Sequence, residues 1–349
     1  MIHASAPTRF ANSPQKRLYI MTIPVLICDD SSMARKQMAR ALPADWDLEI
    51  SFARNGIEGV DALRAGKGEV LFLDLNMPEM DGYEVLGAIR SEDLHTMIIV
   101  VSGDIQPEAH QRVMQLGALA FLKKPVDPDK ISELLIQYGI RGESKGEQSR
   151  IDLEVSFMDA CQEVANVAMG RAADLLARLL DVFVVLPIPS VNMIEMSELH
   201  MAVNQVADDD TLSAVCQGFI GAGIAGEALL VFSDSSFSDM AELMKYKGEI
   251  DESAQVELIM DVASILLGAC LTGFADQLDI SFSQGHPMVL GQHIKVRDLL
   301  KNSISQWKQT LAIEIAYSIE NRRINCDLLL LFTEDSVPAL TSRLAYIVD

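Results

Sequence analysis

Short apolar runs alternate with amphipathic stretches between Ile23 and Tyr138. The runs are almost entirely apolar, which is typical of parallel strands buried on both faces of a sheet. The stretches between them repeat apolar positions at helical spacing. Five strand–helix units in succession predict an α/β, doubly wound, five-stranded parallel sheet. The predicted strands are Val25–Cys28, Leu48–Phe52, Val70–Leu73, Met97–Val101 and Ala120–Leu122.

The second half of the chain contains two related copies of a long helix followed by strands. Glu163–Pro189 matches Asp261–Pro287 at seven of 27 positions when the chain is compared with itself at an offset of 98 residues. Each copy continues with two more strands and a short helix. The pattern predicts one α+β domain of two pseudo-symmetric repeats. The strand pairs expected near the end of each repeat are Leu212–Gly221 with Gly226–Phe232, and Leu311–Glu320 with Ile324–Phe332.

These patterns divide the chain into four parts. Residues 1–22 lack periodicity and the apolar segment of a signal peptide, so we expect a disordered tail, or an upstream extension of a natural chain that starts at Met21. Residues 23–138 form the first domain and 151–349 the second. The Gly- and Ser-containing segment 139–150 is expected to be a flexible linker. Its reach of at most about 40 Å allows contact between the domains without requiring it, so we interpret it as a passive tether.

Charge and composition exclude several classes of protein. The 349-residue chain has 49% hydrophobic residues and a net charge of −22. Nucleic-acid binding needs clustered Lys and Arg, and no such cluster is present. No apolar run approaches the roughly 18 residues of a membrane span. The five cysteines are scattered and odd in number, which fits neither a disulfide framework nor a zinc site and predicts a reducing, cytoplasmic location.

Charged and hydroxyl side chains follow the predicted strands of the first domain. Asp29 and Asp30 come after the first strand, Asp74 after the third, Ser102 after the fourth and Lys124 after the fifth. The carboxyl ends of parallel strands share one edge of the sheet, so these side chains should meet there. Three carboxylates at one edge suit a hard cation such as Mg²⁺. With a hydroxyl and an ammonium beside them, they outline a site for phosphoryl transfer.

The segments "VLICDDSS", "LFLDLNMPEMDG", "VVSGD" and "FLKKP" resemble the receiver domain of two-component response regulators, the CheY-like family with its flavodoxin-like fold. The resemblance covers about 115 residues in the family's order and spacing. It implies that Asp74 accepts a phosphoryl group from a histidine kinase. It also implies that Asp30 and Asp74 bind Mg²⁺ directly, Asp29 through water, and Asn76 through its carbonyl oxygen.

The same resemblance gives roles to three further residues. Ser102 and Lys124 would contact the phosphoryl oxygens, and Phe121 stands where the family has its aromatic switch residue. The alternative for the acidic residues is that Asp29 and Asp30 merely cap a helix, as aspartate often does. Five residues at five strand ends argue against that simpler explanation.

The first long helix of the second half, Phe157–Leu180, has two distinct faces. Glu163, Asn166 and Gly170 fall on a polar face that we expect to be exposed. Asparagine and glycine disfavour a helix interior, glycine by about 1 kcal/mol, so their presence indicates a constraint other than stability. A carboxamide both donates and accepts hydrogen bonds, and it can therefore orient a water molecule. The opposite, apolar stripe consists of Phe157, Cys161, Val164, Ala168, Ala172, Leu175 and Leu179.

"FMDACQEVANVAMGRAADLLARLL" resembles the signature helix of the CheC, CheX and FliY family of chemotaxis phosphatases. The resemblance implies that Asn166 orients the water that attacks an aspartyl phosphate in a receiver domain, and that Glu163 pairs with that receiver's lysine. The second repeat carries Asp261 and Ser264 at the matching positions. Neither has the chemistry of Glu and Asn, so we expect a degenerate second site.

Together, the two resemblances imply a chemotaxis response regulator, phosphorylated on Asp74, whose output domain is an aspartyl-phosphate phosphatase. Its expected partners are a histidine kinase and a phosphorylated CheY-like receiver, with its own receiver domain as a further candidate. Two other hypotheses stay open. The output domain could be a non-enzymatic binding module controlled by phosphorylation, and the chain could be a phosphate sink. An ordinary solvated role for Glu163 and Asn166 is the simplest alternative to catalysis.

Overall fold

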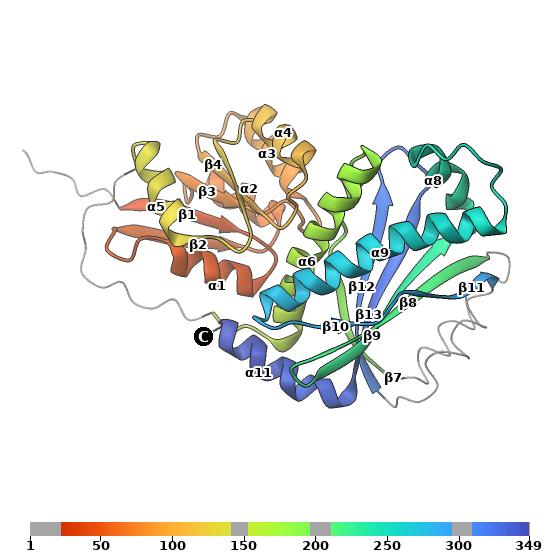
Figure 1. The fold of residues 1–349 in the computed structure, drawn as a ribbon. Coiled ribbons are helices and arrows are strands. Elements are labelled where there is room, and N and C mark those ends of the chain that lie inside the picture. Colours follow the sequence, from red (N-terminus) through yellow and green to blue (C-terminus); the bar gives the residue numbers. More distant parts are fainter. Residues whose placement is uncertain (1–21, 141–152, 196–210, 295–308, 349) are drawn as a thin grey trace, which may run out of the picture.

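A computed structural model describes residues 22–140, 153–195, 211–294 and 309–348, which form two domains in contact with each other (Figure 1). The N-terminal domain is built on a parallel sheet and the C-terminal domain on an antiparallel one. The predicted tail before Thr22 and the predicted linker from residue 141 lie outside the described residues.

The N-terminal domain has the predicted doubly wound sheet, with strand order β2-β1-β3-β4-β5 and all pairs parallel. Helices α1 and α5 cover one face, and α2, α3 and α4 cover the other. The strands are β1 (Ile23–Cys28), β2 (Leu48–Ala53), β3 (Val70–Leu73), β4 (Met97–Ser102) and β5 (Ala120–Lys123). The helices are α1 (Ser32–Ala41), α2 (Gly56–Arg64), α3 (Gly82–Glu92), α4 (Pro107–Gln115) and α5 (Pro128–Gln137).

Local capping explains where the helices of this domain begin. The side chain of Ser31 accepts a hydrogen bond from the backbone N of Ala34 at the start of α1, and Asp81 and Glu84 form a reciprocal capping box at the start of α3. At the other end of the domain, Ile140 is buried in the core beside α5. The domain therefore extends to Ile140, two residues beyond the predicted boundary.

The C-terminal domain has an eight-stranded sheet with two long helices packed against it. The sheet follows the order β10-β8-β9-β13-β12-β6, with β11 paired to β8 and β7 paired to β12. The strands are β6 (Val184–Val185), β7 (Ser190–Glu195), β8 (Leu212–Gly221), β9 (Ile224–Ser233), β10 (Ser283–Gln284), β11 (Met288–Ile294), β12 (Gln309–Ile319) and β13 (Asn325–Thr333). The helices are α6 (Phe157–Leu180), α8 (Phe237–Leu243), α9 (Glu252–Gln277) and α11 (Val337–Val348).

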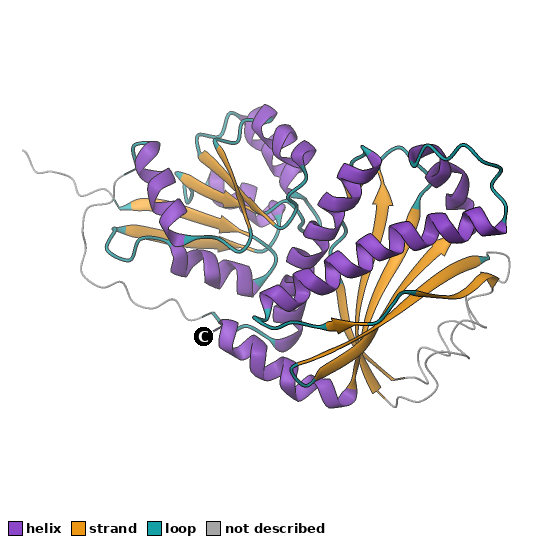
Figure 2. Cartoon of the chain, viewed as in Figure 1, coloured by secondary structure: helices purple, strands orange, loops and turns teal. Residues whose placement is uncertain are grey.

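Helices α6 and α9 pack together and form the core with the inner face of the sheet; Figure 2 shows α9 crossing that face. The two helices come close together at Gly273, where an added Cβ would lie 3.0 Å from the Cα of Ala168. By length and composition alone, α9 could cross a membrane, with a mean hydropathy of 2.0 over its most apolar window. In this structure 61% of that window is buried in the protein, which is the position of a core helix.

Candidate functional site

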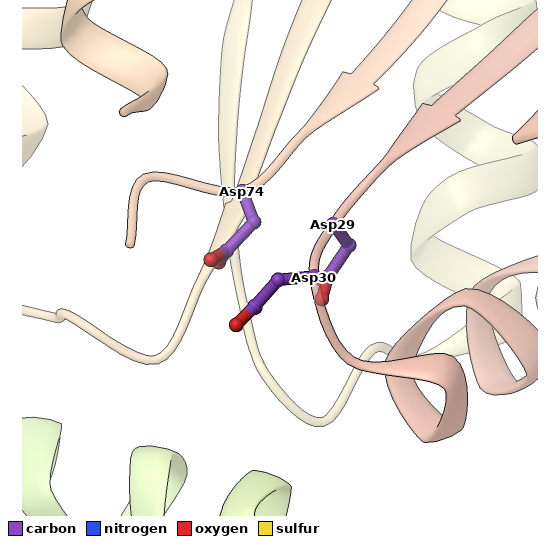
Figure 3. Close-up of side chains that lie close together, drawn as sticks. All are labelled: Asp29, Asp30 and Asp74. Carbon is purple, nitrogen blue, oxygen red and sulfur yellow. The ribbon is translucent and has the colours of Figure 1, made fainter. Parts of the chain in front are cut away.

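Three carboxylates meet at the carboxyl edge of the parallel sheet. Asp29 and Asp30 follow β1, and Asp74 follows β3, the neighbouring strand (Figure 3). One oxygen from each side chain lies within 4.8 Å of the other two. The acidic residues that the sequence assigned to this edge are therefore close enough to share one ligand.

Lys124 brings a positive charge into this acidic cluster from the loop after β5. Its Nζ lies 2.7 Å from Oδ2 of Asp29 and 3.3 Å from Oδ1 of Asp74. The same Nζ lies 3.2 Å from Oε1 of Glu163, which belongs to α6 of the C-terminal domain. All four of these side chains are buried. One ammonium thus joins the carboxyl edge of the N-terminal domain to helix α6 of the C-terminal domain.

Three carboxylates, those of Asp29, Asp30 and Asp74, gather beside the ammonium of Lys124 at this edge. Burial, together with the neighbouring Asp29, raises the pKa of Asp30 to about 7, and burial raises the pKa of Asp74 well above its usual range. Burial alone would lower the pKa of Lys124, but the carboxylates around it outweigh that effect and raise it. The cluster of three carboxylates therefore fits a hard divalent cation such as Mg²⁺, which would favour their charged forms.

The remaining residues predicted for this edge occupy different positions. Ser102 is fully buried at the end of β4, where its Oγ accepts a hydrogen bond from the backbone N of Asp104. The backbone N of Asn76 donates to Oδ2 of Asp74 over 3.0 Å. Phe121 is half-buried on β5 and packs edge-on against His110 of α4. Ser102 and Asn76 thus lie beside the acidic cluster, whereas the aromatic ring contacts α4.

A buried carboxylate in the loop after β4 makes the stability of the N-terminal domain depend on pH. Asp104 is 3% exposed, and burial raises its pKa to about 6, although hydrogen bonds from Gln106 partly oppose the shift. The pKa in the unfolded chain is about 3.9, so the folded state binds the proton more tightly. This group therefore lowers stability progressively as pH rises from about 4 to about 6.

Replacing Asp104 with asparagine keeps the acceptor oxygen and removes the charge. We expect Asp104→Asn to raise the free energy of unfolding by about 2 kcal/mol at pH 7.5 and to have almost no effect at pH 4. Urea denaturation of both proteins across this pH range would measure the difference. If the difference in the free energy of unfolding between the two proteins stays constant with pH, the pH dependence of stability does not come from Asp104.

The polar face of α6 is buried, which corrects the prediction that it is exposed. Glu163 is 4% and Asn166 6% exposed, because the N-terminal domain covers this face. The predicted apolar stripe is only partly buried, since Leu175 and Leu179 are each about half exposed. The earlier stripe residues, such as Cys161 and Val164, are buried as predicted, so the helix is covered on both its apolar and its polar face along its first turns.

Asn166 and Gly170 lie against the loop that follows Ser102. An added Cβ on Gly170 would lie 1.9 Å from the carbonyl oxygen of Gly103, so only glycine allows this approach. On the other side, an added Cβ on Gly103 would lie 3.1 Å from the backbone oxygen of Asn166. Within the described residues, Oδ1 of Asn166 is buried and takes part in no hydrogen bond, whereas Oδ1 of Asp74 lies 3.3 Å from the ammonium of Lys124. Buried polar atoms without partners call for a ligand or water.

Four residues that make contacts between the domains were not among the predicted site residues, although one of them, Asp159, lies on the predicted polar face of α6. Asp159 accepts hydrogen bonds from the backbone N atoms of Ser32 and Met33, at the start of α1, and from the hydroxyl of Ser32. The others are Gln162, Gln106 and Arg112. Sequence patterns indicate which face of a helix is polar, but they do not indicate which distant residue meets it.

The second copy of the helical motif is on a different surface. Asp261 and Ser264 lie on exposed positions of α9, and the hydroxyl of Ser264 donates to the carbonyl of Met260, within its own helix. Gly268, which matches Gly170, has no atom closer than 4.0 Å to an added Cβ. Asp261 and Ser264 are therefore not covered in the way that Glu163 and Asn166 are.

Comparison with known proteins identifies the N-terminal domain. Residues 25–136 match the family model described as "Response regulator receiver domain". A protein-glutamate methylesterase/protein-glutamine glutaminase of Rhodospirillum rubrum is 36% identical over 102 residues, 29% of this chain and 28% of that protein. A protein of the same name from Halalkalibacterium halodurans is 37% identical over 123 residues, 33% of this chain and 35% of that protein. This chain thus covers about a third of those relatives.

Among solved structures, FliY of Thermotoga maritima aligns with 56% of this chain and 100% of its own, with 18% identity and a TM-score of 0.44. The family match supports a plain conclusion about the first domain. Residues 25–136 are a receiver domain. A receiver takes its phosphoryl group from a histidine kinase or another phosphodonor.

Proposed function

We propose that this chain is a response regulator and an aspartyl-phosphate phosphatase, whose C-terminal domain hydrolyses the phosphoryl group on a receiver domain. One observation carries the proposal. Helix α6 presents the carboxylate of Glu163 to the buried Lys124 of a receiver, at 3.2 Å, beside the acidic cluster that includes Asp74. An output helix that reaches into a receiver's phosphorylation site is suited to act on the phosphoryl group there.

Glu163 would act by holding Lys124, and thereby the receiver, in position. Burial raises the pKa of Glu163, while the ammonium of Lys124 opposes that shift and favours the charged form. A phosphoryl group on Asp74 would give Lys124 a further anionic partner beside Asp29 and Glu163. Glu163 is therefore a positioning residue, whose contribution is to fix the geometry between α6 and the phosphoryl group.

Asn166 would act on the water. It lies one helical turn after Glu163, against Gly103, and its buried Oδ1 has no partner among the described residues. A carboxamide oxygen can accept a hydrogen bond from a water molecule and so orient it, although it is too weak to serve as a base. Hydrolysis of an aspartyl phosphate depends mainly on positioning and on stabilisation of charge, so orientation is sufficient.

The receiver's own residues would hold the phosphoryl group. Asp29, Asp30 and Asp74 would bind Mg²⁺, with the carbonyl oxygen of Asn76 as a further ligand. When bound, the ion supplies positive charge to the phosphoryl oxygens. Ser102 and Lys124, at the ends of β4 and β5, would contact the same oxygens.

The C-terminal domain is proposed to belong with the CheC, CheX and FliY phosphatases and to consist of two repeats. The order of its described elements supports this assignment. Helix α6, strands β6 to β9 and helix α8 are followed by helix α9, strands β10 to β13 and helix α11. The two halves meet where α6 packs on α9 and where β9 pairs with β13. The loss of Glu and Asn from α9 leaves one active face.

Removal of the Asn166 amide tests the proposal. We expect Asn166→Ala to slow the loss of phosphate from phospho-Asp74 by about tenfold to a hundredfold, because the water loses its positioning group. The matched control is Ser264→Ala, at the equivalent position of α9, which should decay at the wild-type rate. The measurement is release of inorganic phosphate after labelling with acetyl phosphate. Equal decay in wild type and Asn166→Ala would refute the enzymatic proposal.

The second candidate function is a non-enzymatic binding module. Contacts far from the phosphorylation site favour it, since Gln106 pairs with the backbone of Val184, and Arg112 pairs with Glu320. In that case phosphorylation of Asp74 would control whether the two domains stay together. Normal phosphate release by Asn166→Ala, combined with a phosphorylation-dependent change in the distance between the domains, would favour this function.

A further inference from the structure

We infer that the substrate of the α6 face is the phosphoryl group on this same chain, so that dephosphorylation is intramolecular. The inference rests on the proposed function and specifies its partner. The α6 face is occupied by the chain's own receiver, through contacts at three separate places. Only one of these places includes residues of the phosphorylation site.

The first additional place is the start of α1. Asp159 accepts from the backbone N atoms of Ser32 and Met33, each at 3.2 Å, and so supplies a negative charge to the helix N-terminus. The Met33 side chain, 2% exposed, is buried within the core of the C-terminal domain. A residue of the receiver is thus part of the output domain's core, which indicates a built interface rather than an occasional contact.

The second additional place lies on the other side of the phosphorylation site. The side-chain amide of Gln106 donates to the carbonyl of Val184 at 2.8 Å and accepts from its backbone N at 2.9 Å. Gln106 is 1% exposed, so this paired contact is fully enclosed. It depends on both the oxygen and the nitrogen of the Gln106 side chain, so the contact requires a carboxamide at this position.

Arg112 of α4 extends this contact outward. Its guanidinium donates to both carboxylate oxygens of Glu320, at 3.0 and 2.6 Å, and lies 4.0 Å from the centre of the Phe183 ring. A bidentate pair of this kind fixes orientation as well as distance. With the contacts at α1, it places the receiver in a single orientation on α6.

The close approach at Gly170 leaves no room for a second receiver on this face. The loop at Gly103 is in backbone contact with α6, and any other receiver would have to displace it. A tethered domain has a local concentration of roughly millimolar, which exceeds the micromolar concentration of a typical free partner. The attached receiver therefore outcompetes free receivers for the α6 face.

The reaction is a simple hydrolysis within one molecule. The oxygen of the water forms a bond to phosphorus, and the bond between phosphorus and the Asp74 carboxylate oxygen breaks. The electron pair of that bond stays on the Asp74 carboxylate, and both protons of the water leave with the phosphate. The chain returns to its unphosphorylated form, so this activity sets how long its signal lasts.

A mixing experiment with full-length proteins separates intramolecular from intermolecular action. Asn166→Ala keeps the phosphoacceptor and lacks the water-positioning amide, while Asp74→Asn keeps α6 and cannot be phosphorylated. We expect wild type to lose phosphate with a rate constant that is independent of protein concentration. We also expect phosphorylated Asn166→Ala to stay slow when excess Asp74→Asn is added.

Each other outcome has a distinct meaning. Rescue of Asn166→Ala in proportion to the added Asp74→Asn would overturn the intramolecular inference and leave the phosphatase proposal intact. Equal decay of wild type and Asn166→Ala without any mixing would instead remove the proposed function itself. The two failures are therefore distinguishable in one set of measurements.

A charge-reversal pair tests the interface without changing the phosphorylation site. Arg112→Glu places a third carboxylate beside Glu108 and Glu320, and we expect it to slow phosphate loss by about tenfold as the receiver separates. Combining it with Glu320→Arg restores an opposite-charge pair and should recover most of the rate. A wild-type rate in Arg112→Glu would contradict the claim that this interface is needed for hydrolysis.

Discussion

Replacing Gly170 with leucine is expected to separate the receiver from α6 and to slow phosphate loss from Asp74 by more than about a hundredfold. A Cβ at this position would lie 1.9 Å from the carbonyl oxygen and 2.5 Å from the carbonyl carbon of Gly103. Both atoms belong to the backbone, so no side-chain rotation relieves the overlap. All contacts that depend on docking, including that of Glu163 with Lys124, would be lost together.

The substitution should leave α6 itself intact. Leucine favours a helix interior over glycine by nearly 1 kcal/mol, so the helix gains stability while the interface is lost. The matched control is Gly268→Leu on α9, where an added Cβ has no neighbour within 4 Å except the side-chain oxygen of Gln284, at 4.0 Å. Small-angle scattering should report a larger radius of gyration for Gly170→Leu alone. Unchanged compactness and an unchanged rate would show that the close approach is not required.

The acidic edge of the receiver could be predicted from sequence because the reasoning needed only local order and one rule of topology. Asp29 and Asp74 each follow a fully apolar strand, and parallel strands end at a common edge. The structure brings them together with Lys124. The proposed roles in Mg²⁺ binding and phosphoryl transfer remain predictions from chemistry and resemblance.

The environment of α6 could not be predicted in the same way. Hydrophobic periodicity separates polar from apolar faces, but it does not distinguish solvent from a polar partner surface. Glu163 and Asn166 have the pattern of exposed residues and are buried under the receiver. Leu175 and Leu179 have the pattern of core residues and are about half exposed.

The contacts that hold the two domains together could not be predicted for a second reason, which is that their partners are far apart in the sequence. Asp159 meets residues 126 and 127 positions away, and Arg112 meets Glu320 at a separation of 208. No local signal distinguishes an arginine that pairs across domains from one that pairs within its own helix. Arg112 does both, since it also binds Glu108, four residues earlier.

Replacing Lys124 with methionine is expected to cost about 3 to 5 kcal/mol of stability, because buried charges lose their partner. The ammonium contacts Asp29, Asp74 and Glu163, and all three carboxylates are buried. Methionine has a similar length and supplies no charge. We expect a lower melting temperature for the receiver and a weaker interaction between the receiver and α6. The control is Lys123→Met, the neighbouring exposed lysine, which should have little effect.

Two further measurements test whether the stability lost in Lys124→Met comes from the unpaired carboxylates and not from poorer packing of the methionine side chain. Mg²⁺ should raise the melting temperature of Lys124→Met more than that of wild type, because the divalent ion offsets carboxylates that no longer have an ammonium partner. Glu163→Gln should destabilise wild type but have little effect, or a favourable one, in the Lys124→Met background, because there it removes a repelling charge. Additive effects of the two substitutions would mean that the pair between Lys124 and Glu163 does not join the domains. If the double variant is instead less destabilised than the sum of the two single variants, Lys124 and Glu163 interact across the domains, and this ammonium connects the phosphorylation site to α6.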